Sequence, residues 1–384
     1  MPAESRKRRP LAIGLLVLAT TALTLVAAEV LLRLVPPSEP KVLGELSYSL
    51  ADGTPVKNLK EALERGAIVE VPPPLPRPRY TWAPSQRFFL NYSDQAVLQH
   101  DWLDAQGRVP VRINASGLRE RDEIQPEKPA GQRRVVCVGD SFTFGWGIPE
   151  ERGWVRLLEE ELRRSGQDIR TVNCGAVGTV CIDEYVAGLR HRFAKFQPDV
   201  VVLTICLNDL VPSSGLSLVV PVQPTGSRLL DLVLGVVGRG PLDLDPARDW
   251  VQELLDLPPA EAAAAGITDH DRPAEAMWST GVPQQSLREA KAWCDSRKVP
   301  FLVVLWPFLQ GLGPGRHYPF QKLHDLVAAE CKAAGIPFAD VLPALRDTPH
   351  EKLWVTPRDM HANPLAQQLA LPVIRQLVHT HAGL

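Results

Sequence analysis

The stretch from Val135 to Gly147, with the sequence VVCVGDSFTFGWG, constrains the fold more than any other part of the chain. It opens on a continuous apolar run that is rich in β-branched residues and ends at Gly139. Such a run between turn signals predicts a strand buried on both faces. Beyond Gly147, apolar residues recur at helical spacing up to Gly166, a residue type that often ends helices (Trp154, Leu157, Leu158, Leu162). The sequence therefore predicts a strand, a tight loop and a helix.

The place of Ser141 in this loop makes it a candidate nucleophile. In open α/β sheets, the junction between a strand and the next helix faces the ligand crevice. No Gly-Lys-Ser/Thr follows, which excludes a phosphate-binding P-loop, and Thr143 stands where a Gly-x-Ser-x-Gly elbow needs its second glycine. Taken alone, the loop fits equally well a turn in which Asp140 or Ser141 only caps backbone amides.

Three further motifs follow in a fixed order: Asn173 to Gly178 (NCGAVG), Asn208-Asp209, and Asp359-Met360-His361. With Gly139-Asp140-Ser141, they resemble the four blocks of the SGNH (GDSL-type) hydrolase superfamily. Within that superfamily, the chain resembles a bacterial, membrane-anchored esterase or acylhydrolase. The resemblance covers roughly residues 108 to 384 and includes the lead-in Asn114 to Arg119 (NASGLR).

The resemblance implies a serine-dependent acyl transfer that needs no cofactor and no metal. Ser141 would be the nucleophile and His361 the base, while Asp359 would accept the other imidazole proton and fix the tautomer. The oxyanion donors would be the backbone amides of Ser141 and Gly178 and the side-chain amide of Asn208. Glycine lets the backbone approach a substrate closely, and asparagine supplies a neutral donor.

The sequence departs from the superfamily pattern in two places. Cys206 replaces the glycine of the usual Gly-x-Asn-Asp block, and we expect it to tighten the backbone beside the oxyanion hole. Only Met360 separates Asp359 from His361, where two residues often intervene. Neither departure removes a catalytic atom.

Alternating strands and helices predict an α/β fold, a three-layer α/β/α flavodoxin-like sandwich around a mostly parallel five-stranded sheet of order 2-1-3-4-5. The predicted strands are 135–138, 169–173, 200–205, 301–306 and 337–340, and the predicted helices include 182–193, 320–331 and one that starts at Pro364. Asn363 should cap this last helix. Asp359 and His361 are then expected on the loop before it.

The amino terminus predicts a membrane helix. Residues 1–10 form a basic tail, and residues 11–35 are mostly apolar and carry no charge except at Glu29 and Arg33. At about 1.5 Å of rise per residue, this run can cross a hydrocarbon core of about 30 Å. The basic tail should stay cytoplasmic, which puts the rest on the periplasmic or cell-surface side. The alternative is a signal peptide cleaved after Ala28, which would give a secreted protein; the length of the run favours the anchor.

Residues 36–130 predict a proline-rich stalk or accessory region, in which Arg87–Leu90 and Val109–Ile113 are possible edge strands. Residues 131–384 would form the catalytic domain, interrupted by an insertion at 211–283. We interpret the insertion as a lid or substrate-binding element, with a surface decoration as the alternative. It holds an apolar piece (229–237), a predicted helix (around 250–255), an alanine-rich turn (260–265) and an Asp-His-Asp sequence (269–271), for which exposure is favoured over metal binding.

The composition of the chain narrows the classes of protein and of site that fit it, but it does not indicate a specific function. With 45% hydrophobic and 22% charged residues the chain can bury a core, and a net charge of −2 gives no electrostatic case for nucleic-acid binding. The six cysteines form no CxxC pair, which argues against a zinc ribbon. Core packing is favoured for those in strands, whereas Cys294 and Cys331 could pair outside the cytosol.

The leading function is a serine esterase or acylhydrolase that cleaves acetyl or lipid esters, with an acylated small molecule, lipid or glycan as substrate. An O-acyltransferase acting on cell-envelope glycans could use the same triad. A non-catalytic glycan-binding or scaffold protein could share the fold, because a fold does not fix an activity. The sequence leaves the acyl length, the natural substrate and the oligomeric state open.

Overall fold

The computed structural model describes residues 4–34, 48–56, 59–71, 79–92, 101–177, 180–210, 227–236, 278, 280–318, 320–357 and 359–384. The chain divides into two compact units. One unit comprises Met1–Gly44 and Val219–Arg248, and the other comprises Glu45–Leu218 and Asp249–Leu384. Both sides of residue 130 thus belong to the larger unit.

A five-stranded parallel sheet forms the centre of the larger unit, in the order β11-β10-β9-β7-β8. Its strands are β7 (Arg133–Gly139), β8 (Ile169–Gly175), β9 (Val200–Cys206), β10 (Phe301–Trp306) and β11 (Phe338–Asp340). Numbered along the chain, this is the predicted order 2-1-3-4-5. Every residue of β9 and β10 is buried, as expected of strands covered on both faces.

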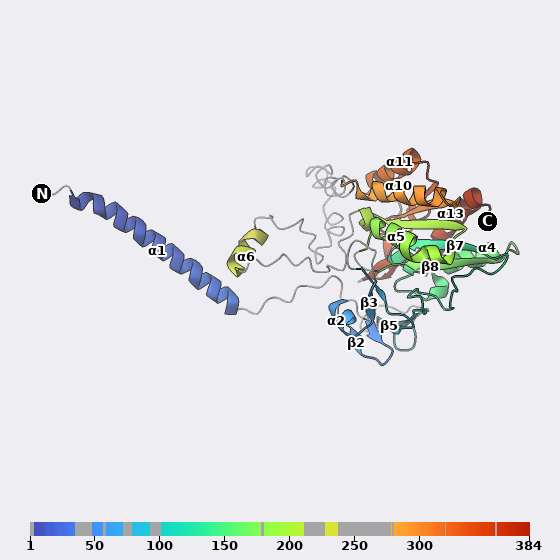
Figure 1. The fold of residues 1–384 in the computed structure, drawn as a ribbon, viewed down its shortest axis with the longest axis horizontal. Helices are drawn as coiled ribbons and strands as arrows, with labels where there is room; N and C mark the ends of the chain where they lie inside the picture. The colour runs from blue at the N-terminus through green and yellow to red at the C-terminus, as the bar shows by residue number, and fades with distance from the viewer. Residues whose placement is uncertain are drawn as a thin grey trace. The chain divides into compact units, whose positions relative to one another are not determined.

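Helices cover both faces of this sheet, which confirms the predicted α/β sandwich. The crossover from β7 to β8 runs in the opposite direction to the later crossovers, so right-handed connections place the helices in two layers. α4 packs against β8 and α13, whereas α10 packs against α5 and β10 (Figure 1). The helices are α3 (Ser141–Phe144), α4 (Trp154–Arg163), α5 (Ile182–Gly188), α10 (Val282–Asp295), α11 (Gln321–Ala333), α12 (Leu342–Leu345) and α13 (Pro364–Ala382).

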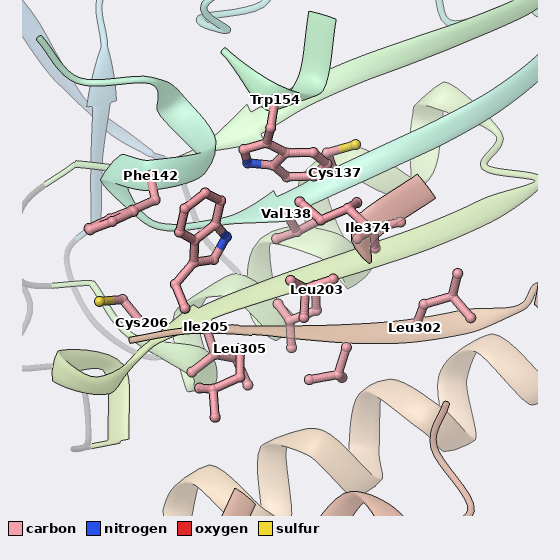
Figure 2. Close-up of a cluster of buried hydrophobic side chains, with 14 of the residues drawn as sticks. Cys137, Val138, Phe142, Trp154, Leu203, Ile205, Cys206, Leu302, Leu305 and Ile374 are labelled. Carbon is pink, nitrogen blue, oxygen red and sulfur yellow. The ribbon is translucent and has the colours of Figure 1, made fainter. Parts of the chain in front are cut away.

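The main core lies between the sheet and these helices. Figure 2 shows Val138, Leu203 and Leu305 from three adjacent strands gathered with Trp154 of α4 and Ile374 of α13. All six cysteines are buried free thiols, so Cys294 and Cys331 do not pair in this structure. Both side chains pack in the main core instead.

The accessory region builds a second, antiparallel sheet in the order β2-β1-β5-β6, beside a hairpin of β3 and β4. Its elements are β1 (Tyr48–Leu50), β2 (Pro55–Val56), α2 (Leu59–Glu64), β3 (Ile68–Val71), β4 (Arg79–Trp82), β5 (Arg87–Asn91) and β6 (Arg108–Arg112). The two segments predicted as possible edge strands are β5 and β6. β6 is an edge strand, but β5 pairs with both β1 and β6 and therefore lies inside the sheet. The core of this region includes Phe144, Trp146 and Ile148, so it packs directly on the loop that follows Ser141.

A buried ionic cluster joins the end of the accessory region to the main sheet. Glu120 is fully buried and binds Arg156 of α4 and Arg170 of β8, each at 3.1 Å. It also accepts the backbone amide of Asn173 at 2.6 Å. Glu159 contacts the same two arginines, at 3.1 and 3.4 Å.

The segment with Asp359 and His361 differs from the sequence expectation. It is a short strand, β13 (Asp359–Ala362), paired antiparallel with β12 (Trp354–Thr356), rather than a loop. Pairing with β12 supplies the hydrogen bonds that an isolated four-residue segment would lack. α13 then begins as predicted, because the Asn363 side chain accepts the amide of Ala366.

The smaller unit contains two described helices, α1 (Glu4–Leu34) and α6 (Arg228–Val236). Within α1, Leu16–Leu34 is long and apolar enough to cross a membrane. α6 corresponds to the predicted apolar piece of the insertion. The other predicted features of the insertion (250–255, 260–265 and 269–271) lie outside the described residues.

Candidate active site

Ser141 is the first residue of α3 and follows β7 at the carboxyl edge of the sheet. Asp140 caps α3 by accepting the amides of Phe142 at 3.0 Å and Thr143 at 3.4 Å. Among the described residues, the Ser141 amide donates no hydrogen bond. Gly175 at the end of β8 lies so close that a Cβ there would overlap the backbone of Phe144. Asp140 therefore has the capping role, and the Ser141 side chain and amide are left for another partner.

Ser141, His361 and Asp359 form one chain of hydrogen bonds. His361 Nε2 lies 2.9 Å from Ser141 Oγ, although 220 positions separate the two residues in the sequence. His361 Nδ1 lies 2.5 Å from Asp359 Oδ1. The His361 side chain is 32% exposed and that of Asp359 is 13% exposed, so the imidazole borders solvent while the carboxylate lies beneath it.

Tyr92, the residue after β5, completes the hydrogen bonding of Asp359. Its hydroxyl donates to Asp359 Oδ2 at 2.7 Å, and its ring is buried. Gly147 makes room for this contact: a Cβ there would lie 2.8 Å from the Tyr92 hydroxyl and 2.6 Å from Val355. Gly147 also has a φ of +79°, which favours glycine. The sequence offered no signal for Tyr92, because it falls in a stretch without periodicity.

Arg119, the last residue of the lead-in motif, fixes the loop after α3. Its buried guanidinium donates to the backbone carbonyls of Phe144, Gly145 and Ile148. It also lies over the Phe144 ring, 5.1 Å from the centroid. Since a rigid fork of donors matches several carbonyls at once, this one side chain holds the shape of the loop. The resemblance identified the motif but gave Arg119 no role.

The mutual attraction of Asp359 and His361 shifts their pKa values in opposite directions. Burial alone would lower the pKa of His361, but the Asp359 carboxylate, its hydrogen bond and the more distant Asp140 outweigh burial and raise this pKa. Burial would likewise raise the pKa of Asp359, yet His361 and the hydrogen bonds from His361 and Tyr92 lower it. The pair is therefore suited to an ionised aspartate beside an imidazole that binds a proton readily.

Two further carboxyls lie beneath the loop. Burial raises the pKa of Asp140 to about 6, and burial with the nearby Asp140 raises that of Asp209 well above its ordinary value. Asp209 accepts the amide of Cys206 and the hydroxyl of Tyr185, each at 2.8 Å. Asp209 thereby fixes the turn that carries Asn208. Cys206 is buried at the end of β9, in the place of the usual glycine.

Of the two other predicted oxyanion residues, the structure describes only Asn208. Asn208 follows β9 in a 3-10 turn (Leu207–Leu210), at the same edge of the sheet as Ser141, and its side chain is exposed. Gly178 lies outside the described residues. In the part of the chain that the structure describes, no group of three or more His, Cys, Asp or Glu side chains is placed to hold a metal ion.

Comparisons with known proteins find esterases among the chains that are similar to this one. The chain is 29% identical over 76 residues to an arylesterase of Vibrio mimicus, and 32% identical over 80 residues to esterase TesA of Pseudomonas aeruginosa. These matches cover 20% and 21% of this chain and span about two fifths of each relative, 38% and 39%. Among solved structures, it is similar to an acetyl xylan esterase from Geobacillus stearothermophilus, with 13% identity and a TM-score of 0.39, over 64% of this chain and 94% of the other.

The match that decides the family covers more than half of the chain. Residues 137–369, from the centre of β7 to the first turns of α13, match the GDSL-like lipase/acylhydrolase family. This segment contains Ser141, Asn208, Asp359 and His361. The chain therefore belongs to the GDSL-like lipase/acylhydrolase family.

Proposed function

We propose that the protein is a membrane-anchored serine esterase or acylhydrolase that acts on acetyl or lipid esters outside the cytoplasm. The observation that carries the proposal is the unbroken hydrogen-bond chain from Ser141 Oγ through His361 to Asp359. Membership of the family and the two esterase relatives support ester bonds as the target. The apolar span in α1, with basic residues before it, supports the anchor and its orientation.

The proposed reaction has two halves. Ser141 Oγ attacks the ester carbonyl while His361 Nε2 takes its proton, and the Asp359 carboxylate stabilises the imidazolium. The amides of Ser141 and Gly178 and the Asn208 side chain would hold the negative oxygen of the tetrahedral intermediate. The alcohol leaves with the proton from His361. Water, activated by the same imidazole, then releases the acid and restores Ser141.

Activity-based labelling tests this proposal directly. We expect a fluorophosphonate probe to modify the full-length protein in detergent, and peptide mass spectrometry to place the adduct on Ser141. The same preparation should hydrolyse p-nitrophenyl esters. An adduct on another residue would refute the assigned nucleophile, and absence of any ester turnover would favour a binding protein. Acyl transfer to an added glycan in preference to water would instead indicate the acyltransferase.

Removing the Tyr92 hydroxyl should weaken catalysis without unfolding the protein. In Tyr92→Phe, Asp359 Oδ2 loses its donor; a hydrogen bond to a charged group is worth about 1.5 to 3 kcal/mol, so we expect kcat/KM to fall on the order of tenfold or more. The less stabilised carboxylate should also raise the pKa of His361 and move the acid limb of the pH profile upward.

Tyr48→Phe is the matched control for this substitution. Tyr48 is a buried tyrosine of the same accessory sheet, and its hydroxyl has no hydrogen-bond partner within the described residues. We expect this variant to keep wild-type kcat/KM and the wild-type pH profile. Equal activity of the two variants would show that Tyr92 does not position Asp359.

A further inference from the structure

Glu29 is a carboxylate inside the candidate membrane span Leu16–Leu34. Charged side chains within such spans are costly and are normally paired. Glu29 binds Arg33 one turn later, with Arg33 Nε 2.7 Å from its Oε1. It also accepts hydrogen bonds from residues about 200 positions away, at the start of α6. The acidic interruption of the apolar run thus has a partner in the insertion.

The contact satisfies the amino-terminal end of α6. Glu29 accepts the Ser227 hydroxyl and the Leu229 amide, each at 2.9 Å, and the Arg228 amide at 3.2 Å. The Leu230 amide binds Ser227 Oγ at 3.2 Å, so the first amides of α6 all have acceptors. The carboxylate also lies at the positive end of the helix dipole.

A second polar contact runs in the opposite direction. The Arg228 guanidinium donates to the backbone carbonyl of Leu32 at 2.8 Å, close to the carboxyl end of α1. Side chain and backbone of each helix therefore contribute to the junction. Glu29 lies five residues before Leu34, which is about 7.5 Å along the helix axis. This distance places the junction at the depth of a membrane interface when Leu34 marks the end of the span.

Both helices leave apolar side chains uncovered beside this junction. On α6, the exposed fractions are 46% for Leu230, 53% for Leu232 and 47% for Val233. On α1, Val26, Val30 and Leu31 are 62%, 51% and 64% exposed. Because α6 is bound to α1, any apolar environment that covers the exposed side chains of α1 also reaches the exposed side chains of α6.

We propose that α6 is a second membrane element, which lies in the bilayer interface beside α1, is fixed by Glu29, and has lipid acyl chains over Leu230, Leu232 and Val233. The inference rests on the membrane anchor within the proposed function and not on the ester chemistry. It also requires that α1 is retained, because cleavage after Ala28 would leave Glu29 at a chain end without the helix that presents it.

Fluorescence in vesicles tests the position of α6. The full-length protein carrying Leu232→Cys is labelled with NBD and placed in phosphatidylethanolamine/phosphatidylglycerol vesicles that contain brominated lipid. The native cysteines are buried, so labelling is selective. We expect the emission of the probe at position 232 to be blue-shifted and quenched by the brominated lipid. A probe at Lys332→Cys, an exposed position on α11, should show neither the blue shift nor the quenching. Unquenched emission at position 232 would overturn the proposal, including the case in which a second copy of the chain shields the probe.

Glu29→Ala tests the docking contact itself. We expect this variant to lose the quenching at position 232. Thr24→Ala should not, because the Thr24 hydroxyl bonds only to the Thr20 carbonyl of its own helix among the described contacts. Quenching that persists in Glu29→Ala would refute the role of Glu29.

The mass of the membrane-extracted protein tests whether α1 is retained. We expect an intact amino-terminal helix, and a mature chain that starts at Glu29 would refute the proposal. Turnover of a soluble ester, measured on the same samples, should not change in Glu29→Ala. If the wild type shows quenching at position 232 but no ester turnover, the proposed esterase activity fails and the proposed position of α6 stands.

Discussion

Replacing Ser141 with alanine is expected to abolish ester hydrolysis, with kcat falling by a factor on the order of 10⁵ to 10⁶ for a p-nitrophenyl ester. The substitution removes the only atom that would attack the carbonyl, and it leaves His361 facing a methyl group instead of a hydroxyl. Residual catalysis over water would come from binding and the oxyanion donors. Steady-state kinetics and fluorophosphonate labelling, both on full-length protein, measure the effect.

Ser165→Ala serves as the control for this loss. Ser165 follows α4, and its hydroxyl donates to the Leu162 carbonyl, so the change removes a serine of the same domain without touching the triad. We expect wild-type kinetics. The double variant Ser141→Ala/His361→Ala should be no slower than Ser141→Ala alone, because residues that act as a unit are not additive. Substantial turnover by Ser141→Ala, with labelling retained, would show that another residue is the nucleophile.

Replacing Asp359 with asparagine should lower kcat by a factor on the order of 10⁴. An amide nitrogen that faces His361 Nδ1 would donate to it, which favours the tautomer with its proton on Nε2, and that tautomer cannot accept the Ser141 proton. The loss should appear in kcat, since the aspartate acts on the imidazolium of the transition state. Asp340→Asn is the control, because it alters a second His–Asp pair, in which His324 Nδ1 lies 2.9 Å from Asp340 Oδ2.

The pH profile separates this mechanism from unfolding. In the wild type, kcat/KM should rise as pH increases through the pKa of His361, which Asp359 holds above its ordinary value. In Asp359→Asn, that attraction disappears, so the midpoint should move to lower pH while the plateau falls. A lowered plateau with an unchanged midpoint would contradict the assigned role of Asp359.

The sequence was sufficient for the main sheet because its signals are local and strong. Short apolar runs fix buried strands such as β9 and β10, and the handedness of crossovers leaves few strand orders. Ser141 and His361 could be paired in advance only through motif order, since nothing local relates residues 220 positions apart. The strand β13 was missed because its pairing with β12 depends on tertiary context rather than on propensity.

The contribution of the accessory region could not be read from the sequence. Tyr92 acts through a single hydroxyl, and its value depends on Asp359, 267 positions later. Arg119 is an arginine in a short motif, and only the fold brings three carbonyls of one loop within its reach. Tyr92 contacts Asp359 and Arg119 contacts the loop after α3, and hydrophobic periodicity predicts neither of these long-range contacts.

The ionic cluster around Glu120 determines how short a working fragment can be. A protein expressed from residue 137, where the family match begins, would lack Glu120 and leave Arg156 and Arg170 to share Glu159. Removing one partner of a buried ion pair costs about 3 to 5 kcal/mol, which is much of the stability of an ordinary domain. Truncation for crystallisation or engineering should therefore keep Glu120, and a start before Tyr48 also keeps the accessory sheet, whose core packs on the loop after Ser141.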